Sequence, residues 1–185
     1  MPSNVEVKAR VADAAAFSQT AERLARDGPE TLHQHDRFYA VAQGRFKLRS
    51  FADGAAELIF YDRADAEGPK LSSYSRVAVP DPEAMHAMLK AALGCLGEVR
   101  KRRRVWHVGR TRVHLDEVEG LGTYMELEVM RADGEAPADG AAEAAALLAA
   151  LGIDAGARVS GAYLDLLAKR RPRRQESDSS EFHGL

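Results

Sequence analysis

Polar and apolar residues alternate in seven segments of the chain, and this alternation is the period of a β-strand with two different faces. The Asp53-Gly54 pair between two of these segments is a strong turn signal and predicts a hairpin. Gly109 separates two others and predicts a second hairpin. The seven predicted strands span residues 4–11, 37–41, 45–49, 57–63, 99–108, 112–116 and 124–130.

Four other segments carry the signals of helices, so the sequence predicts an α+β fold. The clearest of them, 81–93, begins with Asp81 as a capping residue and Pro82 at the first helical position, and Gly94 follows its end. The others are an Ala-rich segment at 12–26 that Asp13 caps, an Ala- and Leu-rich segment at 141–151, and a short segment at 161–170.

The last part of the chain has a different composition. A basic run at 169–174 is followed by an acidic, serine-rich run at 176–181, and neither has the apolar positions that a packed element needs. We therefore expect residues 1–170 to form one domain and residues 171–185 to form a disordered charged tail.

Composition sets the class of protein. Of the 185 residues, 45% are hydrophobic and 29% are charged, which is typical of a soluble globular domain. No run approaches the ~20 apolar residues that a membrane helix needs, so no membrane partner is expected. Residues 1–10 lack the apolar run of a secretory signal, and Cys95 has no second cysteine to pair with. Both observations favour a cytoplasmic protein.

The charges are sorted by sign along the predicted strands. The net charge of −2 excludes a uniformly basic protein that coats nucleic acid, and we expect no nucleic-acid partner. One strand nevertheless presents only basic residues on its polar face, another presents two more, and the last strand presents two glutamates. These sets are Arg45, Lys47 and Arg49; Lys101 and Arg103; and Glu126 and Glu128.

Two architectures satisfy this pattern. In the first, the apolar strand faces pack together and the charges face solvent. In the second, the sheet closes into a barrel with a polar lumen, and the helices cover an apolar exterior. Opposite charges inside an empty lumen are costly, but they are expected if a cation binds the carboxylates and a polyanion binds the basic residues. The coincidence of basic and acidic strands favours the barrel.

An opening run and seven later motifs follow one another in the order typical of a known family. The opening run Asn4-Val5-Glu6-Val7-Lys8 resembles the Glu-x-Glu-x-Lys signature of the CYTH superfamily, the triphosphate tunnel metalloenzymes. Its members include class IV adenylyl cyclases, thiamine triphosphatases, inorganic triphosphatases and RNA triphosphatases. The other matching segments are residues 35–39, 44–49, 57–63, 101–106, 114–122, 124–128 and 163–167.

The resemblance implies a closed antiparallel eight-stranded β-barrel over residues 1–170, whose tunnel binds a small-molecule triphosphate with Mg²⁺ or Mn²⁺. The family's catalytic positions correspond to Glu6, Lys8, Glu126 and Glu128. The implied metal ligands are Glu6, Asp116, Glu126 and Glu128. The implied phosphate ligands are Lys8, Lys47, Arg49 and Arg103, with Arg45 and Arg63 as further candidates.

Two residues depart from this scheme or extend it. Asn4 stands where the family signature has its first glutamate, so one negative charge is lost, and Glu57 is a hypothetical replacement. His114 shares a strand face with Asp116, and it is either a hydrogen-bonded residue of the lumen or a proton shuttle.

Three functions are compatible with these residues. The first is metal-dependent hydrolysis of tripolyphosphate, thiamine triphosphate or a nucleoside triphosphate. The second is conversion of ATP to cAMP and pyrophosphate, and the third is a non-catalytic polyphosphate- or nucleotide-binding module. Hydrolysis is favoured because a held triphosphate and water need nothing more, whereas cyclisation needs an adenosine pocket that the sequence does not locate. Monomer and homodimer both remain open.

Overall fold

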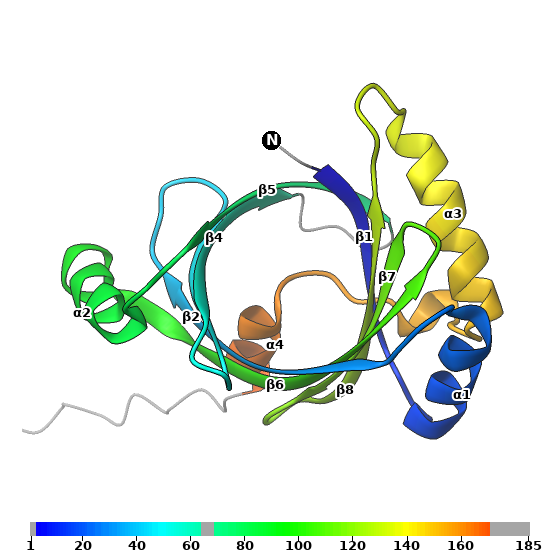
Figure 1. The fold of residues 1–185 in the computed structure, drawn as a ribbon, viewed down its shortest axis with the longest axis horizontal. Coiled ribbons are helices and arrows are strands. Elements are labelled where there is room, and N and C mark those ends of the chain that lie inside the picture. Colours follow the sequence, from blue (N-terminus) through cyan, green and yellow to red (C-terminus); the bar gives the residue numbers. More distant parts are fainter. Residues whose placement is uncertain (1–2, 64–68, 171–185) are drawn as a thin grey trace, which may run out of the picture.

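Eight strands of the described residues close into one antiparallel barrel (Figure 1). The structure is a computed structural model that describes residues 3–63 and 69–170. Around the ring the order is β1-β5-β4-β3-β2-β6-β7-β8, and β8 pairs with β1 to complete it. The predicted closed barrel is therefore confirmed. The strands are β1 (Ser3–Arg10), β2 (Glu30–Tyr39), β3 (Arg45–Phe51), β4 (Ala56–Arg63), β5 (Lys70–Ala78), β6 (Cys95–Val108), β7 (Thr111–Val118) and β8 (Gly122–Met130).

The sequence pattern did not predict β5, and it placed the start of β2 seven residues too late, at position 37 instead of Glu30. In β5, serines occupy both faces, and the outward side chains Leu71 and Val77 are 41% and 62% exposed. Because none of the described helices covers Leu71 or Val77, the strand has no need of regular apolar positions. The same reasoning holds for the exposed first residues of β2.

All four predicted helices are present, with bounds within a few residues of those expected. They are α1 (Ala14–Leu24), α2 (Pro82–Leu93), α3 (Pro137–Ala150) and α4 (Tyr163–Arg170), and a 3₁₀ turn spans Ala155–Ala157. Asp13 and Asp81 cap the first two helices, as predicted: Asp13 accepts two hydrogen bonds of 3.0 Å from backbone N–H groups of the first turn, and Asp81 accepts one of 3.0 Å. None of the described helices is long and apolar enough to cross a membrane.

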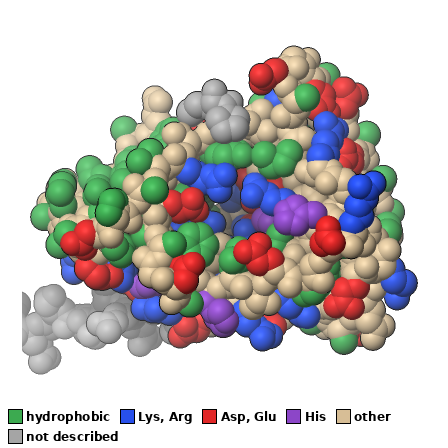
Figure 2. Space-filling model, viewed as in Figure 1, with side chains coloured by type: hydrophobic (Ala, Val, Ile, Leu, Met, Phe, Trp, Pro, Cys, Tyr) green, Lys and Arg blue, Asp and Glu red, His purple; other side chains and the backbone are tan. Residues whose placement is uncertain are grey.

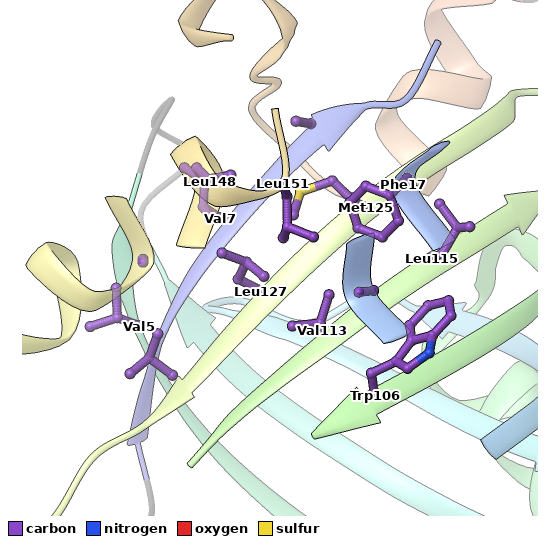
Figure 3. Close-up of a cluster of buried hydrophobic side chains, with 14 residues drawn as sticks. Val5, Val7, Phe17, Trp106, Val113, Leu115, Met125, Leu127, Leu148 and Leu151 are labelled. Carbon is purple, nitrogen blue, oxygen red and sulfur yellow. The ribbon is translucent and has the colours of Figure 1, made fainter. Parts of the chain in front are cut away.

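The main apolar core lies outside the barrel, between the strands and two helices (Figure 3). Side chains such as Val7, Leu115 and Leu127 point outward from β1, β7 and β8 and pack against Phe17 of α1 and Leu148 of α3. Full burial of one such side chain contributes about 1.5–3 kcal/mol, so this cluster stabilises the fold without using the lumen. The inward positions of the same strands are thereby left for polar residues.

The other helices cover different parts of the ring. α2 packs Met85 and Leu89 against the outer face of β2 and β3. α4 packs against one end of the barrel (Figure 1). There Tyr163 contacts Tyr124 and belongs to one buried cluster with Phe38. The predicted charged tail, residues 171–185, lies outside the residues that the structure describes.

Candidate functional site

The barrel encloses a cavity of about 250 Å³ to which all eight strands contribute. Its size is slightly below the range of about 300–1,000 Å³ that is common for sites of drug-sized ligands, which favours a small occupant. Figure 2 shows basic, acidic and histidine side chains gathered around a hollow on this face of the molecule. The charged side chains that line the cavity include Glu6, Lys8, Asp36, Lys47, Arg49, Glu57, Arg63, Lys101, Arg103, Arg112, Glu126 and Glu128.

One side of the lumen is dominated by cations from β3 and β6. Asp36 of β2 lies among them: it accepts a hydrogen bond of 2.8 Å from Lys47 Nζ and two from Arg49, of 2.7 and 2.8 Å. Burial acts to raise the pKa of the Asp36 carboxyl, but the charges of Arg49 and Lys47 outweigh it and hold that pKa well below the usual range. Asp36 is therefore ionised and fixes both cations in place.

Asp36 does not neutralise this side of the lumen. Burial, and after it the charge of Arg49, lowers the pKa of the Lys47 ammonium from 10.5 to about 7. Burial and the charge of Arg103 lower the pKa of Lys101 to about 8. Lysines whose charge is disfavoured in this way gain from the arrival of an anion, so the cluster is suited to bind a polyanion.

The opposite side of the lumen carries two glutamates on β8. Lys8 Nζ lies 2.8 Å from Glu126 Oε1, and Arg103 donates to Glu126 Oε2 at 2.5 Å. Arg112 Nη2 lies 2.7 Å from Glu128 Oε2. Burial acts to raise the pKa values of both glutamates, but the surrounding cations outweigh it, so both pKa values are lowered and both groups are ionised.

His114 of β7 lies beside these glutamates and lines the same cavity. Its side chain is 3% exposed, and its Nδ1 atom has no hydrogen-bond partner in the described structure. Burial, and after it the charge of Arg103, lowers the pKa of its imidazole. One ligand atom from each of His114, Glu126 and Glu128 lies within 4.8 Å of the other two, and carboxylate oxygens with an imidazole nitrogen form a donor set that suits a divalent metal ion.

The two other predicted metal ligands lie in different surroundings. Glu6 lines the cavity, is paired with Arg63, and is the register partner of Glu128 across β1 and β8. Asp116 is fully buried and does not line the cavity. Its oxygens accept hydrogen bonds from Arg103, at 2.7 and 2.6 Å, and from the Tyr163 hydroxyl at 2.8 Å.

Arg63 and Arg45, the two further candidates for phosphate ligands, lie in different places. Arg63 lines the cavity, and besides Glu6 it donates to the Gly161 carbonyl at 3.3 Å. Arg45 lies outside the cavity lining and forms an ion pair with Asp165 of α4, at 3.1 and 2.8 Å.

Asn4 faces the lumen and is 2% exposed, and its Oδ1 atom has no hydrogen-bond partner in the described structure. Its register partner on β5, Ser72, has an unpartnered hydroxyl as well. Buried polar atoms of this kind fit a site that is completed by a ligand. Glu57, the hypothetical replacement for the lost carboxylate, lies six residues along β4 from Arg63, which is the other register partner of Ser72. The sheet therefore does not place Glu57 beside Asn4.

The sequence analysis named neither Asp36 nor Lys101 among the implied metal or phosphate ligands, although both line the cavity. A signal for Lys101 was present, since it shares a strand face with Arg103. For Asp36, the sequence offers only its membership of the motif at 35–39. The alternation of its strand does not show which basic residues of β3 it faces.

Comparisons with known proteins agree with this architecture. A family model described as the CYTH domain matches residues 3–163. A solved structure from Pyrococcus horikoshii is similar with a TM-score of 0.79 and 21% identity, covering 89% of this chain and 99% of that one. A putative adenylate cyclase from Vibrio parahaemolyticus is similar with a TM-score of 0.71 and 20% identity, covering 89% of this chain and 97% of that one.

A Hippeastrum protein is similar with a TM-score of 0.63 and 18% identity, covering 90% of this chain and 95% of that one. It is described as a putative adenylyl cyclase with a dominant triphosphatase activity. At these identities the solved structures show a shared fold. No curated protein matches the chain in sequence.

Proposed function

Because the chain belongs to the CYTH family, we propose that it is a divalent-metal-dependent hydrolase of a small triphosphate held in the lumen of the barrel. One observation carries the proposal: the lining of one cavity brings basic side chains of β3 and β6 together with Glu6, Glu126 and Glu128. A polyphosphate together with a cation complements both sides at once. The activity described for the Hippeastrum protein supports hydrolysis over cyclisation.

The phosphates are bound by the cations of the lumen. Lys47 and Arg49 form one group around Asp36, and Arg103 lies across the lumen between Asp116 and Glu126. The planar guanidinium groups can grip phosphate oxygens in pairs, and the ammonium groups neutralise the remaining charge. Arg63, which is paired with Glu6, is a further candidate for this set. Arg45 remains a candidate at the end of the barrel that α4 covers.

The residues proposed to hold Mg²⁺ or Mn²⁺ are Glu6, Glu126 and Glu128, whose oxygens are ligands that these ions prefer. When bound, the ion neutralises phosphate charge and lowers the pKa of a bound water molecule. Asp116 is the fourth predicted ligand, and its hydrogen bonds to Arg103 suggest a second task, which is to orient that guanidinium.

Lys8 connects the two sides of the site. Its ammonium lies 2.8 Å from Glu126, 3.3 Å from the Gly161 carbonyl and 3.9 Å from the centre of the Tyr163 ring. A cation at this position can contact a phosphate whose other oxygens face the glutamates. Phosphoryl transfer depends mainly on positioning and on stabilisation of charge, and these fixed groups supply both.

The test is to incubate the protein with tripolyphosphate, thiamine triphosphate and ATP in the presence of Mg²⁺ or Mn²⁺ and to resolve the products. Release of phosphate or pyrophosphate without a cyclic nucleotide supports the proposal. Formation of cAMP with pyrophosphate assigns the cyclase reaction instead, and binding without turnover assigns a binding module.

Two variants make the test specific to the lumen. Glu126→Gln removes a proposed metal ligand and is expected to abolish the metal-dependent rate. Arg100→Ala removes a cation from β6 that points outward and whose side chain is 57% exposed, and it should leave the rate unchanged. Equal rates for wild type and Glu126→Gln would exclude the assigned site.

A further inference from the structure

His114 lies buried beside Glu126 and Glu128, and the family resemblance gives it no ligand role. Its Nδ1 atom lies 3.9 Å from Glu126 Oε2 and 3.9 Å from Glu128 Oε1. Both distances are too long for a hydrogen bond. The nitrogen thus faces two carboxylate oxygens without bonding to either, while the side chain is 97% buried.

The register of the sheet directs the imidazole to this position. His114 is the register partner of Glu126, and Arg112 is the partner of Glu128. An inward residue of β7 therefore lies directly opposite one glutamate and diagonal to the next, because alternate residues of a strand share a face. Since β7 pairs with β6 on its other side, the backbone at His114 is fixed from both sides.

The three ligand atoms are close enough for one metal ion to draw together. They lie within 4.8 Å of one another, and the 3.9 Å from Nδ1 to each oxygen shortens by a small rotation of the side chains when all three bind one ion at the usual length of about 2 Å. Glu128 uses different oxygens for its two neighbours: Oε2 pairs with Arg112, and Oε1 faces His114. Glu126 Oε2 is shared with Arg103, so an ion would take over part of that interaction.

We propose that His114 Nδ1 is an additional protein ligand, besides Glu6, of the metal ion held by Glu126 and Glu128, and that it makes the site prefer Mn²⁺ to Mg²⁺. Mg²⁺ favours a shell made only of oxygen ligands. An imidazole nitrogen suits first-row transition metals such as Mn²⁺ better. The proposal deepens the proposed function by assigning the metal preference of the same site.

Direct detection of the nitrogen is the most decisive test. Pulsed electron paramagnetic resonance on the Mn²⁺-loaded protein, without any phosphate ligand, is expected to show modulation from a directly bound ¹⁴N nucleus. His114→Gln should remove this modulation while offering an oxygen in place of the nitrogen. The control His33→Asn changes an exposed histidine of β2 and should keep it.

Calorimetric titrations with MnCl₂ and MgCl₂ measure the preference itself. His114→Gln is expected to weaken Mn²⁺ binding on the order of tenfold or more and to change Mg²⁺ binding much less. Circular dichroism and the unfolding midpoint establish that the variant is folded, and His114→Asn serves as a second substitution if it is not.

Three outcomes would overturn the proposal: no Mn²⁺ binding by the wild type at millimolar concentration, nitrogen modulation that persists in His114→Gln, or equal loss of Mn²⁺ and Mg²⁺ affinity. None of these readouts uses turnover. A protein that binds Mn²⁺ through His114 but hydrolyses no triphosphate would contradict the proposed function and leave this inference intact.

Discussion

The two faces of β6 carry the same types of residue in different surroundings. On the outer face, the Arg100 and Arg102 side chains are 57% and 47% exposed, and each has one glutamate partner, Glu98 and Glu117. On the inner face, the Lys101 and Arg103 side chains are 3% and 5% exposed and share the buried carboxylate of Asp116, and Arg103 also pairs with Glu126. Five consecutive basic residues, 100–104, thus divide into a solvated row and a site.

This difference shows which of the charges matter to stability and binding. An exposed ion pair contributes about 0–1 kcal/mol, because water and salt screen it. Removing one partner of a buried pair costs about 3–5 kcal/mol, because the other charge is left without compensation. Substitutions on the two faces of β6 should therefore give effects of very different size, although they change the same residue types on one strand.

The largest effect is expected for Arg103→Ala. The substitution leaves Asp116 and Glu126 buried without the guanidinium that binds both, so the free energy of unfolding should fall by about 3–5 kcal/mol. Urea unfolding measures the change. Arg102→Ala, one position away on the outer face, should leave it close to the wild-type value, because water and salt screen this exposed pair. Similar losses for both variants would contradict the division of β6 into two functional faces.

Smaller but clear effects are expected on binding. Lys8→Ala and Arg49→Ala each remove one cation of the lumen and should weaken tripolyphosphate binding roughly 10- to 100-fold, since a hydrogen bond to a charged group contributes about 1.5–3 kcal/mol. Calorimetry without added metal measures this. Arg100→Ala is the matched outer-face control. If both lumen variants bind as wild type does, the phosphate ligands have been assigned to the wrong face.

A third prediction concerns pH. The pKa of Lys47 is lowered to about 7, so its ammonium loses its proton as the pH rises through that value, while a bound polyanion favours the charged form. Tripolyphosphate affinity should therefore fall between pH 7 and 9, and binding at pH 8 should take up protons. Calorimetry in two buffers of different ionisation enthalpy detects the uptake. An uptake that is unchanged in Lys47→Arg would assign it to another group.

The smallest effect is expected for Asn4→Glu. It places a carboxylate at the buried position next to Ser72 on the lumen face of β1, and metal affinity measured by calorimetry should rise several-fold. The gain is modest because Arg63, which pairs with Glu6 two residues away, can also pair with the new charge. Unchanged affinity would show that Asn4 is not a metal position.

The sequence predicted best those strands whose outer faces are covered. β1, β7 and β8 must present apolar residues to α1 and α3 and polar residues to the lumen, so their alternation is regular and their inward residues could be named. β5 and the start of β2 have no such cover, and their alternation is lost. The alternation pattern could not predict the ion pairs inside the barrel, because these depend on the register between strands. The register decides that Asp36 binds Arg49 and that Asp116 binds Arg103.

The closing seam of the ring joins β1 to β8, and it sets Lys8 opposite Glu126 and Glu6 opposite Glu128. These partners lie more than one hundred residues apart in the chain, so their contact closes a long loop, which is costly in conformational entropy. Until that seam forms, Lys8 and Glu6 of β1 are separated from the glutamates of β8. Completion of the fold and assembly of the site are consequently the same event, and a partly folded chain has half of a binding surface.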